Sequence, residues 1–212
     1  MTTGITVLGS GAMATACAIL LAQREDQRVS LWARRKELAD EMSASRENRR
    51  LLPGVRLPES IKITADAAEA LDDSNYVVVA IPCQFLRESL TELKPLLNKN
   101  RPIVSVIKGL ENDTFCRPSE IIGDVLGSRA VVVLSGPSHA EEISRRLPTT
   151  VVAASGDLSL ARFNCHFNGA KGSVYEGGIR VPMLLRWPAG LPGGRQLDDM
   201  IHCADWFPTL LA

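Results

Sequence analysis

The 212-residue sequence lacks several features that mark particular classes of protein. Lys+Arg and Asp+Glu balance at 24 each, so no net charge favours binding to nucleic acid or to an anionic membrane surface. The apolar stretches at residues 76–82 and 130–134 are far shorter than the roughly 20 residues that span a bilayer. The first residues carry no basic and apolar export signal. We therefore expect a soluble cytoplasmic protein without a membrane span, whose partner is a small, locally charged molecule.

Cysteine is present but follows no ligand pattern. The five residues are odd in number and widely spaced, and they include no CxxC pair. This distribution argues against a disulfide framework and against a zinc site. We expect reduced thiols and no metal ligands. The five residues are Cys17, Cys83, Cys116, Cys165 and Cys203.

Short β-branched runs alternate with amphipathic segments from residue 3 to about residue 154, at the spacing of βαβ units. Several runs are apolar throughout, as strands covered on both faces of a sheet should be. The expected strands are residues 5–9, 29–32, 61–64, 76–82, 103–107, 131–135 and 150–153. The expected helices are residues 12–24, 36–46, 65–71, 84–97, 119–126 and 138–146. Residues 48–58, which contain Pro53, Gly54 and Pro58, are expected to form a loop.

The composition changes after Arg162. Six of the ten aromatic residues and seven of the sixteen glycines lie in the final fifty positions, where the βα rhythm stops. One convincing strand, residues 181–187, precedes Pro188 there. We therefore predict one domain over residues 1–162. Residues 163–212 are expected to form an irregular C-terminal extension and not an independent domain.

A glycine-rich G-x-G-x-x-A motif stands between the first expected strand and the first expected helix. Its first glycine permits a tight turn, its second lets the backbone approach a pyrophosphate, and its final alanine lets the helix pack closely on the strand. The dipole and free N–H groups of the helix N-terminus then favour the diphosphate. With the βα rhythm, the motif predicts a Rossmann-like, doubly wound and mostly parallel sheet. A turn that merely joins strand to helix is the alternative. The six residues are Gly9, Ser10, Gly11, Ala12, Met13 and Ala14.

Two arginines follow the second expected strand, where many NAD-binding domains carry an acidic residue for the ribose hydroxyls. Arg34 and Arg35 favour a 2′-phosphate and hence NADP. They can also belong to a solvated helix N-terminus, and a guanidinium can stack on adenine, which both cofactors contain. The expected cofactor is therefore NAD or NADP.

Three further segments follow the carboxyl ends of expected strands, where ligands bind in open α/β sheets. Lys108 is placed to meet an anion, with an ordinary surface lysine as the alternative. Residues 135–138 suggest a second glycine turn into a helix, with Ser138 as the N-cap. His139 is either a catalytic base or a helix-surface residue. Pro82, in the segment at residues 81–84, is a candidate cofactor contact.

These motifs, in their order and spacing over about 155 residues, resemble the N-terminal domain of NAD(P)-dependent glycerol-3-phosphate dehydrogenase. The resemblance implies hydride transfer between the nicotinamide and glycerol 3-phosphate or dihydroxyacetone phosphate. A homodimer is a possible assembly of the chain. It also implies that Lys108, Gly136 and Ser138 approach the substrate. The stretches that carry it are GSGAMATACA, VSLWARR, LLPGVRLP, VVVAIPCQFLRESL, SVIKGLENDT and LSGPSHAEEI. The residues that it places at the cofactor are Ala12, Met13, Arg34, Arg35, Lys108 and Ala140.

That family continues into an all-helical domain, which supplies a second lysine as proton acceptor and most of the phosphate contacts. The 212 residues contain no such domain, and residues 1–162 hold no clear replacement for that lysine. No catalytic residue is therefore assigned, and we expect cofactor binding without useful turnover. A nucleotide-binding or interaction protein without catalysis is the blander interpretation.

Residues 165–212 resemble a different family, the arylsulfatase-type sulfatases. The resemblance rests on NGAKGSVYEGGIRVP, LRWP and IHCADWFPTLL, and it implies that Lys171 matches a lysine that contacts sulfate. Sulfate ester hydrolysis also needs a formylglycine from a Cys-x-Pro-Ser-Arg motif and calcium ligands. Residues 116–120, CRPSE, imitate that motif but lack its arginine and the upstream acidic pair. We therefore predict a chimera, with a sulfatase fragment as the alternative function.

Overall fold

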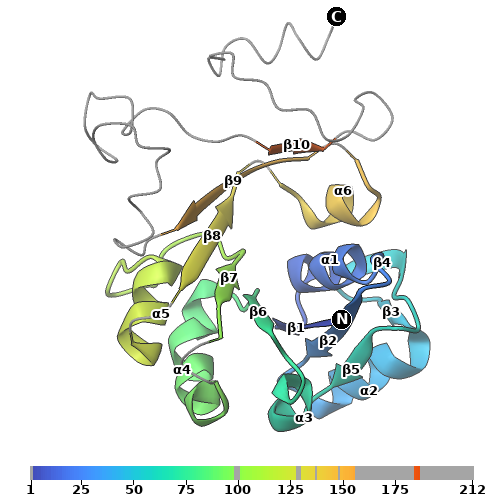
Figure 1. Cartoon of the computed structure of the whole chain (residues 1–212), viewed down its shortest axis with the longest axis horizontal. Helices are drawn as coiled ribbons and strands as arrows, with labels where there is room; N and C mark the ends of the chain where they lie inside the picture. Colours follow the sequence, from blue (N-terminus) through green and yellow to red (C-terminus); the bar gives the residue numbers. More distant parts are fainter. Residues whose placement is uncertain are drawn as a thin grey trace, which may run out of the picture.

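A computed structural model of the chain describes residues 2–97, 101–127, 130–136, 138–147, 149–155 and 184–186. Strands and helices alternate along most of this length (Figure 1). The strands are β1 (Thr3–Leu8), β2 (Gln27–Trp32), β3 (Glu47–Asn48), β4 (Leu52–Arg56), β5 (Lys62–Thr64), β6 (Tyr76–Val79), β7 (Ile103–Ser105), β8 (Val131–Ser135), β9 (Thr149–Ser155) and β10 (Leu184–Arg186). The helices are α1 (Ala12–Leu21), α2 (Lys36–Ser45), α3 (Ala67–Leu71), α4 (Cys83–Leu93), α5 (Pro118–Leu126) and α6 (Ala140–Ser144), with a 3-10 turn at Lys94–Leu96.

Eight of the strands form one sheet, in the order β10-β9-β8-β7-β6-β1-β2-β5. The strands from β8 to β5 run parallel, whereas β9 pairs antiparallel with both β8 and β10. The chain builds outward from β1 through β2 to β5, crosses back to β6 on the other side of β1, and builds outward again. The six parallel strands thus lie in the chain order 3-2-1-4-5-6, which is the Rossmann order, with a topological switch point between β1 and β6. The predicted doubly wound, mostly parallel sheet is confirmed.

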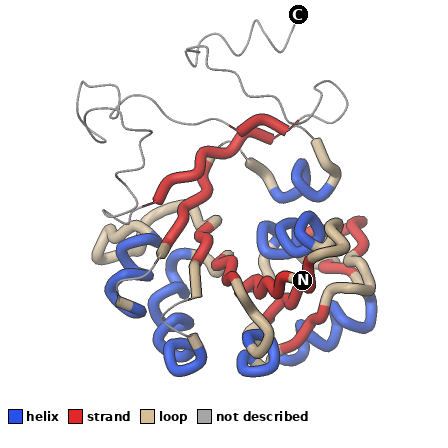
Figure 2. Tube along the Cα trace, in the orientation of Figure 1, coloured by secondary structure: helices blue, strands red, loops and turns tan. Residues whose placement is uncertain are grey.

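Helices cover both faces of the sheet, because side chains alternate between the faces along each strand (Figure 2). In β1, Ile5 and Val7 belong to a core shared with α1, α2 and α6. Leu8, from the other face of the same strand, packs in a core shared with α3, α4 and α5. Both cores are continuous under the helices, which explains the uninterrupted apolar runs. None of the described helices has the length and hydrophobicity to cross a bilayer.

One sequence prediction is wrong: residues 48–58 are not simply a loop. They contain most of a small antiparallel hairpin, in which Asn48 of β3 pairs with Leu52 of β4. Proline and glycine suggested a loop, but the hairpin is held by its apolar side chains, since Leu52 and Leu57 are fully buried in the core on the α1 face. The N–H of Gly54 also donates to the Glu47 carboxylate at 2.7 Å.

Several predicted elements are confirmed with shorter bounds. The helix expected over residues 84–97 leaves the α-helical pattern after Leu93, where the 3-10 turn containing Pro95 begins. The helix expected from residue 138 begins at Ala140. The strand expected over residues 181–187 is present at its centre as β10, which pairs with the last strand of the N-terminal segment.

Candidate functional site

The glycine turn between β1 and α1 lies at the carboxyl end of the central strand. Gly9 has a φ of +124°, and a Cβ added there would lie 2.8 Å from the carbonyl oxygen of Ala80. Its N–H donates to the carbonyl of Trp32 at 3.0 Å, which ties the turn to the end of β2. Only glycine fits this backbone conformation and this close approach to the segment after β6.

Gly11 differs from Gly9, because it keeps space open instead of permitting a strained conformation. It is the N-cap of α1 with a φ of −74°, and a Cβ added there would meet no atom within 4 Å. The first turn of α1 carries no acidic side chain. The first N–H groups of a helix have no intrahelical partners and, with the helix dipole, attract anions. Ser10, Ala12 and Met13 are half-buried beside this space, whereas Ala14 is buried against the sheet. The turn therefore fits a diphosphate group.

Asn48 is a site residue that the sequence analysis missed. It is 1% exposed, and its side-chain amide donates to the carbonyl of Ser10 at 3.0 Å and to the Thr15 hydroxyl at 2.8 Å. The side-chain oxygen of Asn48, Oδ1, accepts from the N–H of Leu51 at 3.2 Å. The Thr15 hydroxyl in turn donates to the carbonyl of Gly11 at 2.9 Å. The hairpin thus holds the glycine turn through a buried hydrogen-bond network, and no local sequence signal distinguishes this asparagine from a loop residue.

Two predicted substrate residues meet across the carboxyl edge of the sheet. The Lys108 ammonium donates to the carbonyl of Ser138 at 2.7 Å and to its hydroxyl at 3.0 Å. The prediction that Ser138 caps α6 is wrong, because His139 is the N-cap residue and makes no side-chain cap bond. The Ser138 hydroxyl is directed to Lys108 instead. Gly136, just after β8, has a φ of +134°, which favours glycine. A fixed cation therefore lies at the edge where ligands of such sheets bind.

The two predicted cofactor arginines differ in their surroundings. Arg34 pairs with two glutamates of α4, Glu88 at 3.1 Å and Glu92 at 2.9 Å. The guanidinium lowers the pKa of Glu88, mainly through its hydrogen bond to the carboxylate and secondly through its positive charge. Arg35 is exposed, and no acidic side chain in the described part of the chain forms an ion pair with it. The two arginines therefore present different charge environments after β2.

The remaining predicted residues follow β6 and β8 at the same edge of the sheet. Pro82 is exposed and is the N-cap residue of α4. Ala140 is buried in the core on the α1 face, and α6 packs beside α1 (Figure 1). His139 is exposed, which agrees with its interpretation as a helix-surface residue.

Two of the three cysteine thiols among the described residues, Cys17 and Cys83, are unsuited to nucleophilic chemistry. Cys17, Cys83 and Cys116 are free. Burial raises the pKa of the Cys17 thiol to about 11. The pKa of the Cys83 thiol is also raised, mainly by burial and secondly by the negative charge of Glu111. Within the described residues no group of three His, Cys, Asp or Glu side chains is arranged to hold a metal ion.

The sulfatase-like motif at residues 116–120 has a structural explanation. Pro118 is the first residue of α5, and Glu120 accepts from the N–H of Arg117 at 2.8 Å in a capping interaction. The motif therefore begins a helix.

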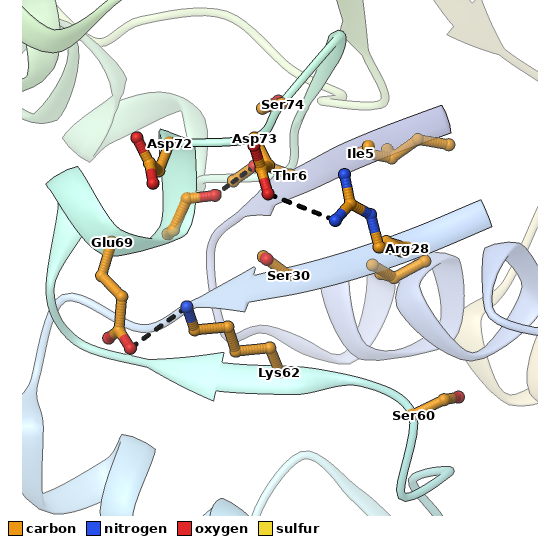
Figure 3. A pocket seen from close by; sticks show the side chains of 13 residues that line it. Ile5, Thr6, Arg28, Ser30, Ser60, Lys62, Glu69, Asp72, Asp73 and Ser74 are labelled. Atoms are coloured by element: carbon orange, nitrogen blue, oxygen red, sulfur yellow. Dashed lines mark hydrogen bonds and ion pairs between the residues drawn. The ribbon is translucent and has the colours of Figure 1, made fainter. Parts of the chain in front are cut away.

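A hollow of about 280 Å³ lies at the opposite, amino-terminal end of the strands (Figure 3). Its two basic residues pair with acidic ones: Arg28 lies 3.2 Å from Asp73, and Lys62 lies 3.1 Å from Glu69. The Thr6 hydroxyl donates to the carbonyl of Ala70 in α3 at 2.5 Å. The hollow borders the C-terminal end of α3, which disfavours anions.

The strand order, the switch point and the glycine turn together define a dinucleotide-binding domain of the Rossmann class. The sequence family described as NAD-dependent glycerol-3-phosphate dehydrogenase N-terminus matches residues 4–161. The chain belongs to this family.

Curated proteins and solved structures give the same result. Glycerol-3-phosphate dehydrogenase (NAD(P)+) of Chlorobium phaeobacteroides is 48% identical over 160 residues, which cover 74% of this chain and 48% of that protein. The enzyme of the same name from Syntrophomonas wolfei is 46% identical over 154 residues, 71% of this chain and 45% of that protein. The crystal structure of glycerol-3-phosphate dehydrogenase from Coxiella burnetii aligns with a TM-score of 0.69 at 32% identity, covering 76% of this chain and 49% of that one.

The chain spans about half the length of the relatives that it matches. The family match ends at residue 161, before the segment with the sulfatase resemblance begins. That segment lies outside the described residues apart from β10.

Proposed function

We propose that this chain binds NAD or NADP at the carboxyl edge of its parallel strands. The observation that carries the proposal is the pair of glycines after β1, of which Gly9 fixes the turn and Gly11 leaves open space at the N-terminus of α1. Residues 9–14 would hold the diphosphate through backbone N–H groups, with Ala12 and Met13 in the first turn of the helix. The buried Asn48 network supports a turn that is organised before the ligand arrives.

The remaining predicted contacts extend from this centre in both directions. Arg34 and Arg35 follow β2, where the adenosine ribose lies in domains of this class. Pro82, Lys108 and Ala140 follow β6, β7 and β8 on the other side of the switch point, and in this proposal they approach the nicotinamide. When bound, the nicotinamide would supply the hydride chemistry, while this chain binds and orients the cofactor.

The substrate follows from the family and from the chemistry of Lys108. A lysine held by Ser138 at the edge of the sheet presents a point charge suited to a phosphate group. We propose that the dehydrogenase to which this domain belongs oxidises glycerol 3-phosphate or reduces dihydroxyacetone phosphate, and that Lys108, Gly136 and Ser138 approach that substrate. For the 212-residue chain by itself, cofactor binding without useful turnover stays a prediction.

Calorimetric titration with NADH, NADPH and adenosine tests the binding proposal. NADH or NADPH should bind at least about tenfold more tightly than adenosine, which lacks the diphosphate; this ratio corresponds to about 1.4 kcal/mol. Equal affinity for adenosine would contradict a site built on the glycine turn. An assay with dihydroxyacetone phosphate and NADH or NADPH tests turnover separately, and robust turnover would contradict the expectation for this chain.

We further propose that the chain divides at residue 162, that it is a chimera with a sulfatase-like extension, that it is cytoplasmic and forms a homodimer, and that it has no nucleic-acid partner. Hydrolysis of an aryl sulfate by the chain would favour the sulfatase alternative, whereas the helix-capping role of residues 116–120 speaks against it.

A further inference from the structure

Arg34 is the second residue after β2, in the region where domains of this class distinguish NAD from NADP. Its Nη1 lies 3.1 Å from Glu88 Oε2, and its Nη2 lies 2.9 Å from Glu92 Oε1. The two glutamates are four residues apart on α4, so they can face one guanidinium together. The ion pairs therefore join the segment after β2, on one side of the switch point, to α4, on the other.

The two carboxylates change what Arg34 offers to a ligand. A lone guanidinium attracts the 2′-phosphate that distinguishes NADP from NAD. With Glu88 and Glu92 beside it, the same position carries one positive and two negative charges. Each terminal nitrogen donates to one carboxylate, so a phosphate that pairs with the guanidinium through both of these nitrogens competes with the two glutamates. NAD has no 2′-phosphate and does not face this competition.

We propose that Glu88 and Glu92 are specificity-determining residues, which weaken the binding of NADP relative to NAD by holding Arg34. The inference rests on the proposed dinucleotide function and adds the choice between the two cofactors. Both glutamates act through Arg34 and are positioning residues. The side chains of Arg34, Glu88 and Glu92 are 43%, 62% and 53% exposed, so solvent screening limits the effect to several-fold.

Separate titrations of the full chain with NADH and NADPH measure this choice. In the variant with Glu88→Gln and Glu92→Gln, the ratio of NADPH affinity to NADH affinity should rise about three- to tenfold. NADH affinity itself should change less than about twofold. The rise should shrink at high salt, because the Debye length falls to about 3 Å at 1 M. In an Arg34→Gln background, the same two substitutions should change the ratio much less.

The matched control is the variant with Glu69→Gln and Asp73→Asn, which removes two surface carboxylates from ion pairs at the amino-terminal end of the strands. It changes the net charge equally and should leave the ratio unchanged. An unchanged ratio in the Glu88 and Glu92 variant, or an equal rise in the control, overturns the inference. An unchanged effect in the Arg34→Gln background also overturns it. If the wild-type chain binds neither cofactor, the proposed function fails first, which separates the two failures.

Discussion

The two ends of the parallel strands both present charged side chains, but they offer different things to a ligand. At the amino-terminal end, Arg28 and Lys62 are each paired with a carboxylate around a hollow, next to the C-terminal end of α3. At the carboxyl end, the N-terminus of α1 opens above Gly11, and the Lys108 ammonium is held by neutral oxygens of Ser138. The comparison teaches that a hollow is not enough to make an anion site. Unpaired positive charge and free N–H groups must also be directed into it.

The largest expected effects come from the two glycines of the turn. Gly9→Ala should lower the free energy of unfolding by about 3 kcal/mol, because it combines a strained φ with a clash against Ala80. Gly11→Ala should change stability by less than about 0.5 kcal/mol, since the added methyl meets no atom. It should nevertheless weaken dinucleotide binding about tenfold or more, equivalent to about 1.4 kcal/mol.

Urea unfolding and NADH titration of both variants separate folding from binding. If Gly11→Ala bound NADH like the wild type, the space above α1 would not be the diphosphate site, and the distinction between the two ends would be lost.

Asn48→Ala should have the next largest effect. It removes the donor to Ser10 and Thr15 and leaves the N–H of Leu51 without its side-chain acceptor, which should cost about 2 kcal/mol of stability. NADH affinity should fall several-fold because the turn is less well held.

Asn75→Ala is the matched control at the amino-terminal end, where the side chain of Asn75 accepts from the N–H of Gly4 at 2.7 Å. Thermal unfolding and NADH titration compare the two variants. Equal losses of NADH affinity would show that Asn48 acts through general stability and not through the turn.

Lys108→Met should weaken binding of the phosphorylated substrate or of the cofactor about three- to tenfold, with a stability change near 0.5 kcal/mol, since the lysine is exposed. Lys62→Met removes an exposed lysine at the other end, which is paired with Glu69, and should leave ligand affinity unchanged. Titration at two salt concentrations checks the assignment, because the loss should be larger at low salt. A loss of the same size in Lys62→Met would mean that overall charge, and not position, governs binding.

The smallest effect concerns acid sensitivity at the start of α5. Hydrogen bonds from the Arg117 side chain and backbone lower the pKa of Glu120 from 4.5 to about 2. Because the folded-state pKa is the lower one, this contribution to stability is complete above pH 4.5 and is lost as the pH falls toward 2. Glu120→Gln should therefore reduce the loss of stability between these pH values, measured as the urea midpoint at pH 7 and pH 3. The variant would lose as much stability as the wild type if the carboxylate were not stabilised by the cap.

Local patterns were enough to predict most of the fold. Apolar runs predicted the parallel strands, because strands buried on both faces need apolar side chains throughout. The prediction failed at the hairpin, where Pro53 and Gly54 indicated a loop although Leu52 and Leu57 are buried in the core. Turn residues describe the local backbone, whereas the pairing of β3 with β4 depends on what the rest of the chain packs against them.

The sequence by itself determined the glycine turn, the doubly wound sheet and the dinucleotide class, because each depends on residues close together in the chain. Tertiary structure decided which side chains complete the site. Asn48 reaches Thr15 across 33 positions, Lys108 reaches Ser138 across 30, and Arg34 reaches Glu88 across 54. No sequence period relates such partners. They meet only because the parallel strands bring their carboxyl ends to one edge, while the helices between them, on either face of the sheet, return the chain to the amino-terminal edge.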